Sequence, residues 1–318
     1  MTDIDCLSVG ILVADHGCAP ISHLPAAGEL LLADRLTLSV GGCASNVAID
    51  LARLAVSVGV VGCVGEDTLG RFVIETLEAA RIDSSGVRPW AGVGTSGTLI
   101  INVAGEDRRF IHTLGANAHF AAVDIPLARV RAAKVLYVGG YLLMPALVAV
   151  ELAEVFRQAR AWGVTTVLDI GLPGPGDQWP HLAPVLPHTD VFLPNHHEAT
   201  AITGLSDPRQ QAQRFHDAGA GTVVITCGGQ GTVLVTKGQR LRAGAYALPV
   251  VASTGAGDAF AAGYIAALLA GADLPRCLEW GSALGASCVR GVSATESVFT
   301  RAEAEEFLRE HPLKIESW

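Results

Sequence analysis

The segment Ser253-Thr254-Gly255-Ala256-Gly257-Asp258-Ala259-Phe260 contains the residues best suited to chemistry in this chain. In the turn Gly255-Ala256-Gly257, no side chain larger than a methyl group prevents the backbone N–H groups from converging on one point. An apolar run that predicts a helix follows at once, and its N-terminus adds partial positive charge at that point. The segment therefore predicts an anion-binding corner with Asp258 at its edge.

Asp258 places a carboxylate where it would repel a bound phosphate. This pairing makes sense if the carboxylate deprotonates a hydroxyl group that then attacks a phosphoryl group. Acidic residues are also favoured in the first turn of any helix, so a structural role explains Asp258 equally well from the residues alone.

Two further groups of residues could bind a polar ligand. Gly41 and Gly42 open a predicted helix, where bare backbone lets a ligand approach closely, and Asn46 one turn later could bind a hydroxyl group. A tight turn followed by a buried or capping asparagine is the alternative. Asp15 ends the first β-prone run, residues 6–14, and could either bind two hydroxyl groups of a polyol or cap a turn.

Phosphate binding by this chain cannot use the common lysine-containing loop, because no Gly-x-x-x-x-Gly-Lys-[Ser/Thr] sequence is present. Backbone amides, arginine and a metal ion would have to bind the phosphates of a nucleotide. Asn195 and Glu198 are three residues apart and share a face if a helix begins there, so they could hold the water shell of Mg²⁺. A solvated helix start is the alternative. The spacing Gly92-Val93-Gly94-Thr95-Ser96-Gly97 precedes a β-rich run and is interpreted as the base of a hairpin.

The elements that position these residues alternate between strands and helices. Strands are predicted at 58–63, 134–138, 164–170, 190–193, 222–226 and 232–236, and helices at 67–80, 145–162, after 257, after 274 and from 300. This alternation predicts a mostly parallel sheet covered on both faces. A hairpin of 98–103 with 109–112, together with an irregular stretch from 17 to 38, should project beside the sheet.

The candidate residues should gather at one edge of this sheet. Ligands of such folds bind at the carboxyl ends of the strands. Each of five candidates follows a predicted strand: Asp15, Gly41, Asn195, Thr226 and Gly255.

Composition narrows the class of protein. The 318 residues are 50% hydrophobic and 17% charged, with a net charge of −9, which argues against a nucleic-acid groove or an anionic membrane surface as the main partner. Seven scattered cysteines without a Cys-x-x-Cys pair predict reduced thiols in a cytosolic protein. The acidic N-terminus does not resemble a secretory signal, and the longest apolar stretch, 259–272, is too short to span a bilayer.

The ordered set of motifs resembles the ribokinase-like (PfkB) carbohydrate kinase family over nearly the whole chain. The motifs are Gly41-Gly42-Cys43-Ala44-Ser45-Asn46-Val47-Ala48, Gly65-Glu66-Asp67-Thr68-Leu69-Gly70, Gly115-Ala116-Asn117, Asn195-x-x-Glu198 and Ser253 to Asp258. Each motif is modest alone, and the specificity lies in their order.

The resemblance implies a three-layer αβα sandwich with a mostly parallel central sheet and a small β lid. It implies a single domain over residues 1–318, with the lid formed by about 12–38 and 90–115, and transfer of a phosphoryl group from ATP, with Mg²⁺, to a hydroxymethyl group of a sugar or sugar-like acceptor. The roles it implies are Asp258 as general base; the Gly255, Ala256 and Gly257 amides as anion hole; Asp15, Gly41, Gly42 and Asn46 for the acceptor; Asn195, Thr226, Gly228, Gly231 and Thr254 for the nucleotide; and Glu198 for Mg²⁺ through water.

One position departs from the family pattern. Many members have an aspartate before the Ser/Thr-Thr pair, where it helps to coordinate potassium, and this chain has Ala252. The loss of this oxygen ligand leaves activation by a monovalent cation in question. The resemblance also implies a homodimer paired through the lid. The composition predicts a cytoplasmic protein with neither a nucleic acid nor a membrane as partner.

The sequence does not identify the acceptor molecule. A nucleoside kinase with the same machinery and a non-catalytic sugar-binding relative are the alternatives. Four arginines lie in or beside the expected lid, and two or more facing the acceptor would favour a phosphorylated sugar. Solvated arginines on a hairpin edge are the simpler explanation. The four are Arg35, Arg88, Arg108 and Arg109.

Overall fold

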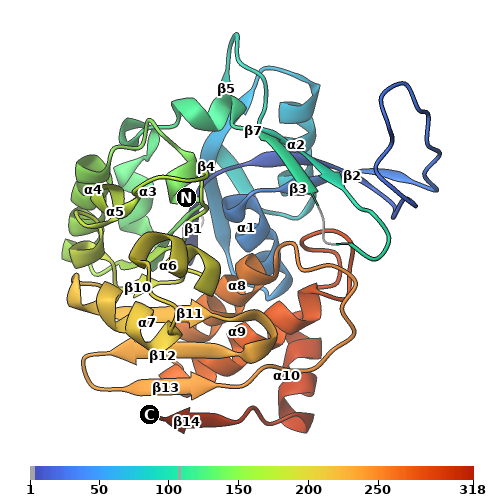
Figure 1. Ribbon diagram of the computed structural model, residues 1–318. Helices are drawn as coiled ribbons and strands as arrows, with labels where there is room; N and C mark the ends of the chain where they lie inside the picture. The colour runs from blue at the N-terminus through green and yellow to red at the C-terminus, as the bar shows by residue number, and fades with distance from the viewer. Residues whose placement is uncertain (1–3, 107–108) are drawn as a thin grey trace.

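The computed structural model describes residues 4–106 and 109–318, which form one large sheet between two layers of helices and a smaller second sheet (Figure 1). This architecture confirms the fold class predicted from the sequence. Among the residues described, none of the helices combines the length and the apolar character needed to cross a bilayer.

The large sheet contains β1 (Cys6–Gly10), β4 (Val58–Gly65), β5 (Asp83–Trp90), β8 (Val135–Gly139), β9 (Thr165–Leu168), β10 (Val191–Phe192), β11 (Thr222–Thr226), β12 (Thr232–Thr236), β13 (Arg240–Ala243) and β14 (Ile315–Ser317). The second sheet contains β2 (Val13–Cys18), β3 (Leu36–Gly41), β6 (Gly97–Ile101) and β7 (Arg109–Thr113). The α-helices are α1 (Cys43–Arg53), α2 (Thr68–Ala79), α3 (Leu127–Ala132), α4 (Ala149–Ala161), α5 (Trp179–Leu182), α6 (His196–Thr203), α7 (Pro208–Asp217), α8 (Ala256–Leu269), α9 (Leu274–Cys288) and α10 (Arg301–Glu310). Short 3₁₀ helices are η1 (Gly115–His119), η2 (Ala122–Asp124), η3 (Tyr141–Leu143), η4 (Leu186–His188) and η5 (Gly228–Gln230).

The large sheet has the strand order β14-β13-β12-β11-β10-β9-β8-β1-β4-β5. Neighbouring strands are parallel from β5 to β11, whereas β12, β13 and β14 are antiparallel to their neighbours. The central strands β1, β4 and β8 are buried along their whole length. Parallel strands that are covered on both faces need such continuous apolar sequence.

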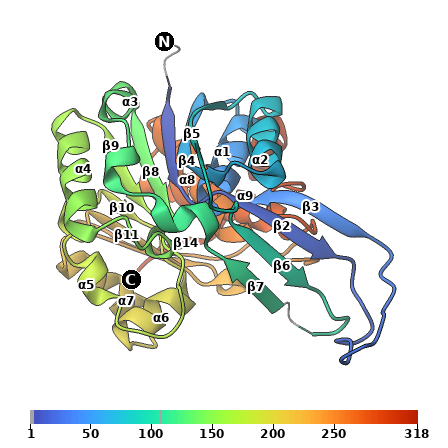
Figure 2. The same ribbon diagram turned by 90° about the horizontal axis from the view of Figure 1, so that it is seen from above.

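Each face of the large sheet has its own hydrophobic core. Residues of α1, α2, α8, α9 and α10 pack together over one face, and residues of α3, α4, α5, α6 and α7 pack over the other (Figures 1 and 2). The helix α8 has nine buried residues and belongs entirely to the first core, which explains its uniformly apolar sequence.

The chain turns sharply between β1 and β2. Gly10 has a φ of 142°, and a Cβ atom there would lie 2.1 Å from the Gly139 carbonyl oxygen, so the turn requires glycine. The Asn117 side chain then holds Leu12 by accepting from its N–H (3.2 Å) and donating to its carbonyl oxygen (3.0 Å). The prediction of one strand over residues 6–14 is therefore wrong, and Asp15 belongs to the second sheet.

The second sheet projects from the body of the molecule, and we call it the lid (Figure 2). Its strand order is β3-β2-β6-β7, and the antiparallel pairing of β6 with β7 confirms the predicted hairpin. The stretch from 17 to 38 was expected to be irregular, but its two ends belong to β2 and β3, which pair antiparallel. Backbone pairing between these distant segments, rather than local sequence, creates the extra strands.

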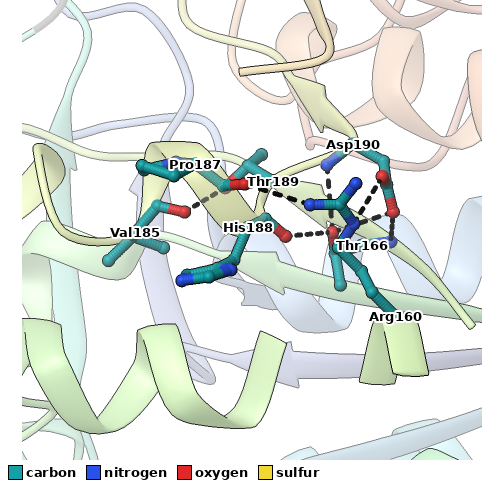
Figure 3. Close-up of polar contacts among 7 residues, drawn as sticks. All are labelled: Arg160, Thr166, Val185, Pro187, His188, Thr189 and Asp190. Carbon is teal, nitrogen blue, oxygen red and sulfur yellow. Dashed lines mark hydrogen bonds and ion pairs between the residues drawn. The ribbon is translucent and has the colours of Figure 1, made fainter. Parts of the chain in front are cut away.

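Polar contacts at the edge of the sheet opposite the candidate residues fix the start of β10 (Figure 3). The Asp190 carboxylate accepts from the Thr166 backbone N–H (2.9 Å) and pairs with the Arg160 guanidinium (3.0 Å). The Thr166 hydroxyl donates to the His188 carbonyl oxygen (2.7 Å), and Arg160 also donates to the Pro187 carbonyl oxygen (3.0 Å). These contacts tie α4, β9 and the segment before β10 together.

We expect Asp190→Ala to destabilise the fold by about 2 kcal/mol, because it leaves a buried N–H group and a guanidinium without their acceptor. Urea unfolding measures this change through the shift of the midpoint. Glu154→Ala is the matched control, since Glu154 forms an exposed ion pair with Arg157 on the same helix, α4. If the unfolding midpoint of Asp190→Ala shifts no more than that of Glu154→Ala, this network does not stabilise the fold.

Several element boundaries differ from those predicted. The helix expected at 145–162 begins only at Ala149. Three strands of the large sheet, β5, β13 and β14, were not predicted. β5 is an edge strand with the sequence Asp-Ser-Ser-Gly-Val-Arg-Pro-Trp, which has little β-propensity, so only its place beside β4 makes it a strand.

Candidate active site

Asp258 is the third residue of α8, and Gly255 is the N-cap of this helix. Gly255 has a φ of 82°, and a Cβ atom there would lie 2.5 Å from the Ala294 Cβ atom, so both the backbone and the space require glycine. The prediction that Gly255 follows a strand is wrong: residues 244–255 are all described and none belongs to a strand. Instead the backbone N–H groups of Val251 and Ala252 bond to the Val289 carbonyl oxygen at the end of α9.

The start of α8 is open to a ligand. No side chain caps the helix, and a Cβ atom on Gly257 would meet nothing within 4 Å. The Ala256 N–H makes only a long bond, 3.3 Å, to the Ser253 carbonyl oxygen. The first N–H groups of a helix have no partner within the helix and carry partial positive charge, so this corner can bind an anion.

Asn46 on α1 holds the Asp258 carboxylate by donating a 2.8 Å hydrogen bond from Nδ2 to Oδ2. Burial raises the pKa of Asp258, while the hydrogen bonds from Asn46 and from the Cys43 thiol lower it. A carboxylate that is desolvated but still ionised is a stronger base than one in water. The structure therefore brings together two residues, 212 positions apart, that the sequence singled out separately.

Asp169 is a site residue that the sequence analysis did not identify. It follows β9, and its carboxylate accepts from the Tyr137 hydroxyl (2.9 Å) and from the Ile170 N–H (2.8 Å). Burial raises its pKa well above the usual value, and the charges of Glu198 and Asp258 raise it further. One ligand atom each of Cys43, Asp169 and Asp258 lies within 4.8 Å of the others. The available signal was a single acidic residue within a predicted apolar strand, 164–170.

Asn195 and Glu198 cap α6 reciprocally. The Asn195 side chain accepts from the Glu198 N–H (2.9 Å), and the Glu198 carboxylate accepts from the Asn195 N–H (2.9 Å). Burial raises the pKa of Glu198 to about 7; the Asn195 backbone N–H opposes this shift and the charge of Asp258 adds to it. Helix capping fixes where this carboxylate lies, beside Asp169 at the same edge of the sheet.

The loop after β11 lies next to Asn195. Thr226 ends β11 and bridges to Asn195 in parallel fashion, and the Cys227 N–H closes the loop onto the Gly231 carbonyl oxygen (2.8 Å). Gly228 and Gly231 have φ values of 53° and 89°. At Gly231 a Cβ atom would also lie 2.0 Å from the Ala243 carbonyl oxygen. The predicted glycines are thus needed to form this loop.

Thr254 directly precedes Gly255 and is part of the turn that leads into α8. Its carbonyl oxygen accepts a hydrogen bond from the Cys288 thiol of α9 (3.3 Å). The same thiol also donates toward the Ala294 carbonyl oxygen (3.1 Å). The Cys288 side chain of α9 therefore links this turn to the segment that follows α9.

Asp15 comes to the site on the lid. A Cβ atom on Gly41 would lie 1.9 Å from Asp15 Oδ2, so the bare backbone of Gly41 makes room for this carboxylate. Burial raises the pKa of Asp15 to about 6; a hydrogen bond with Thr98 opposes the shift and the charge of Asp258 adds to it. Gly42 is the N-cap of α1, with a φ of 92°. The acceptor residues implied by the resemblance therefore lie together.

The two faces of the lid differ in polarity. Ser39, Asp15, Thr98 and His112 lie side by side across the four strands, and the Thr98 hydroxyl also bonds His112 Nδ1 (3.1 Å). The next row, on the opposite face, consists of Leu38, His16, Leu99 and Ile111. We call the first set the polar row and the second the apolar row. Because Asp15 is near Asp258, the polar row is the one directed at the site.

The base of the lid is tied to α2. Asp67 is the N-cap of α2, where it accepts from the Gly70 N–H (2.8 Å). Its other oxygen accepts from the Thr95 N–H (2.7 Å), and the Thr95 hydroxyl accepts from the Gly65 N–H (2.9 Å). This explains the spacing of the Gly65–Gly70 motif: it anchors the segment that enters the lid.

Two of the lid arginines are engaged in ion pairs. Arg88 pairs with Asp124 (2.6 Å) and lies over the Trp90 ring, 4.6 Å from its centre. Arg109 pairs with Glu106. Arg35 is exposed, and Arg108 lies outside the described residues.

Known proteins with similar sequences and structures match this chain over nearly its whole length. The family model described as pfkB family carbohydrate kinase matches residues 3–301. A ribokinase of Haemophilus influenzae is 28% identical over 308 residues, covering 94% of this chain and 97% of that protein. A 5-dehydro-2-deoxygluconokinase of Geobacillus kaustophilus is 28% identical over 329 residues, covering 97% and 94%. The solved structure of Arabidopsis thaliana ribokinase complexed with ribose and ATP has a TM-score of 0.83 and 25% identity, covering 97% of this chain and 99% of that one.

Proposed function

The chain belongs to the pfkB family of carbohydrate kinases, which are phosphotransferases with alcohol acceptors, and we propose that it transfers the terminal phosphoryl group of ATP to a hydroxymethyl group of a sugar or sugar-like acceptor. The observation that carries the proposal is the placement of Asp258. A buried carboxylate, held by Asn46, stands beside the uncapped start of α8. A base and an anion site side by side are what deprotonation of a hydroxyl and attack on phosphorus require.

In the proposed reaction Asp258 accepts the proton of the acceptor hydroxyl. The oxygen then forms a bond to the terminal phosphorus of ATP while the bond from that phosphorus to the bridging oxygen breaks, and ADP leaves. The amides of Gly255, Ala256 and Gly257 donate to the oxygens of the phosphoryl group in transit, where negative charge is concentrated. Asp15, Asn46 and the bare backbone of Gly41 and Gly42 orient the acceptor.

The nucleotide would extend from α8 along the neighbouring loop. Thr226, Gly228 and Gly231 border this loop, and Asn195 and Thr254 flank it. In the described residues the candidate site offers no lysine, so the phosphates depend on amide dipoles and on a metal ion. That the Arabidopsis relative was solved with ribose and ATP supports these ligands for this chain.

The donor set fits Mg²⁺. Carboxylate oxygens are its preferred protein ligands, and Glu198 of α6 lies close enough to Asp169, which follows β9, for its charge to raise the pKa of Asp169. Mg²⁺, when bound, neutralises phosphate charge that would otherwise repel these carboxylates. Glu198 would hold it through water, and Ala252 offers no side-chain oxygen to a monovalent cation.

This assignment predicts an acidic limb in the rate that depends on Glu198. Its pKa is about 7 because of burial, so the carboxylate is ionised above this pH and protonated below it. The rate at limiting Mg²⁺ should therefore rise between about pH 6 and pH 8. Glu198→Gln should flatten this limb and weaken the apparent affinity for Mg²⁺ by roughly 10- to 100-fold.

Varying Mg²⁺ at fixed ATP separates this limb from the one due to Asp15, which has a pKa of about 6 and should appear in the KM for the acceptor. Glu303→Gln is the matched control, because Glu303 forms the same capping box with Thr300 on α10, far from the site in sequence. An unchanged Mg²⁺ dependence in Glu198→Gln would contradict the role assigned to this residue.

A panel of acceptors coupled to ADP release tests the proposed function directly. Ribose and 5-dehydro-2-deoxygluconate represent the relatives, fructose 6-phosphate represents phosphorylated sugars, and adenosine represents nucleosides. Arg88 and Arg109 are engaged in ion pairs and so are not free to bind a substrate phosphate, which favours an unphosphorylated sugar or sugar acid as the acceptor that is turned over. Sugar binding by calorimetry with no ADP formed from any acceptor would instead favour a non-catalytic relative.

We further propose that the protein is a homodimer paired through the lid. Leu38, Leu99 and Ile111 of the apolar row are 43%, 47% and 62% exposed, and Leu36 at the end of β3 is 79% exposed. This face points away from the polar row and therefore from the chain's own site. Contiguous apolar surface on a small sheet with free edges is favourable to cover, and a second copy offers the complementary surface.

Leu38→Asp should weaken the dimer by more than about 30-fold, because it places a charge in the apolar face that the dimer would bury. Sedimentation at micromolar concentration measures the change as a shift from dimer to monomer. Val150→Asp is the matched control, since Val150 is also an exposed apolar residue (65%) but lies on α4 of the main body. If the unmodified protein sediments as a monomer, the dimer proposal is wrong.

A further inference from the structure

One face of α1 carries polar side chains that the proposed chemistry only partly uses. Asn46, Asp50 and Arg53 are spaced by four and three residues, so they follow one another along the same face of the helix. Within the described parts of the chain, four of their buried atoms have no hydrogen-bond partner: Asn46 Oδ1, both carboxyl oxygens of Asp50 and Arg53 Nε. Asn46 donates to the proposed base Asp258, but Asp50 has no role in the steps given above.

Asp50 lies in a position that does not suit a charged group. It is fully buried, with 0% of its surface exposed, in the layer where α1 packs against α8. An ionised carboxylate without a donor is strongly disfavoured in such surroundings, whereas a neutral acid is tolerated. Burial raises the pKa of Asp50 well above the usual value, the charge of Asp258 raises it further, and Arg53 opposes the shift.

Three other titratable groups of the core to which α1 belongs add no positive charge to that of Arg53. Cys6 from β1, Tyr137 from β8 and Tyr264 from α8 belong to the same core as the buried side of α1. Burial raises the pKa of each, so all three are neutral at physiological pH. Arg301 of α10 directs its Nε to the Leu54 carbonyl oxygen instead.

Asn46 also has a buried oxygen that lacks a hydrogen-bond donor. Its Nδ2 donates to Asp258, but its Oδ1 is buried and lacks a donor. Asp50 is one helical turn away on the same face, and a protonated carboxyl has one O–H group to donate. Two bare acceptor oxygens would repel each other, whereas a single proton between them satisfies both residues.

We propose that Asp50 is a positioning residue for phosphoryl transfer: its carboxyl carries a proton and donates a hydrogen bond to Asn46 Oδ1, which fixes the Asn46 amide with its nitrogen toward Asp258. The amide of an asparagine can turn over, and the opposite orientation would place its oxygen against the Asp258 carboxylate. A donor at Asp50 removes that alternative. The kinetic part of this inference rests on the proposed function, but the proton on Asp50 is a property of the folded chain alone.

Two substitutions separate the donor from the volume of the side chain. Asp50→Asn keeps an N–H donor but cannot ionise, and we expect kcat to stay within about 3-fold of the unmodified protein. Asp50→Leu has a similar size but no donor, and we expect kcat to fall roughly 10- to 100-fold with little change in the KM for ATP. Ser8→Ala is the control for general damage to α1, because the Ser8 hydroxyl bonds the Ala44 carbonyl oxygen (2.8 Å) without touching Asn46.

The proton is tested without any substrate. The infrared difference spectrum of the unmodified protein and Asp50→Asn at neutral pH should contain the C=O band of a protonated carboxyl group. In urea unfolding, the folded state holds this proton while the unfolded state releases it above about pH 4, so stability should decline as pH rises. This decline should be smaller in Asp50→Asn. The unfolding midpoint of the variant should therefore increase relative to that of the unmodified protein as pH rises.

Absence of the protonated band, or an Asp50→Leu variant with unchanged kcat, would overturn the inference. An Asp50→Asn variant as impaired as Asp50→Leu would also overturn it, because a carboxylate rather than a donor would then be required. If the unmodified protein phosphorylates no acceptor, the proposed function fails by itself. The infrared band and the pH-dependent stability still decide whether Asp50 is the proton donor to Asn46.

Discussion

Replacing Asp258 by asparagine is expected to lower kcat for phosphoryl transfer by roughly 10²- to 10⁴-fold while leaving the KM for ATP within about 3-fold. The amide has the same shape as the carboxyl group, and its oxygen still accepts the hydrogen bond that Asn46 Nδ2 donates. What is lost is the capacity to take a proton from the acceptor hydroxyl. The nucleotide binds to backbone amides, which the substitution leaves in place, so the loss should appear in kcat.

Steady-state kinetics with the best acceptor of the panel measures this effect. Asp273→Asn is the matched control, because Asp273 is the N-cap of the next helix, α9, and accepts from the Arg276 N–H (3.0 Å) away from the site. Burial raises the pKa of Asp258, so removing its charge should not lower the unfolding midpoint. Turnover by Asp258→Asn within tenfold of the unmodified protein would mean that another group is the base.

The parts of the site that the sequence predicted are those built by local sequence. The turn before α8 needs glycine at position 255 for its backbone conformation, and the apolar run that follows can only be a buried helix. The capping boxes at Asn195 and Thr300 likewise depend on residues three positions apart. Propensity and spacing contain this information, so the capping box at Thr300 was predicted correctly and the helix at Asp258 was predicted to within two residues of its start.

The parts that were missed depend on contacts between distant segments. Residues 6–14 are almost all apolar or small. They form two strands in different sheets only because Gly10 packs against Gly139 and the Asn117 side chain bonds the Leu12 backbone. Asp169 looked like the interior of a strand until the neighbouring strands placed it at the edge. Hydrophobic periodicity cannot distinguish these cases, because it reports burial and not the partner.

Asp50 was missed for a related reason. It lies with Asn46 and Arg53 on the polar face of the helix, and a charged residue on such a face is usually assigned to the solvent side. α1 is covered on more than one side, by the sheet and by α8, so its buried surface is wider than the apolar stripe in the sequence. Only the packing of α8 reveals that Asp50 is inside.

Gly41→Ala is expected to raise the KM for the acceptor by roughly 10- to 100-fold, because an added Cβ atom would lie 1.9 Å from Asp15 Oδ2 and must displace that carboxylate. The clash is with a side chain and not with backbone, and the lid can keep its strands. Asp15 is the acid proposed to bind two acceptor hydroxyls, so its displacement should affect acceptor binding. The KM for ATP should change little, since the nucleotide residues lie on other strands.

The pH dependence gives this prediction a second measurement. Burial holds the pKa of Asp15 at about 6, so in the unmodified protein the KM for the acceptor should rise as pH falls through that value and the carboxylate becomes protonated. A carboxylate pushed toward solvent in Gly41→Ala should titrate nearer its ordinary value of about 4, which moves this limb to lower pH. Gly97→Ala is the matched control in the same sheet, because its Cβ atom would make only an ordinary 3.4 Å contact with the Ala14 carbonyl oxygen. If Gly41→Ala binds the acceptor as tightly as the control and with the same pH limb, Asp15 does not hold the acceptor.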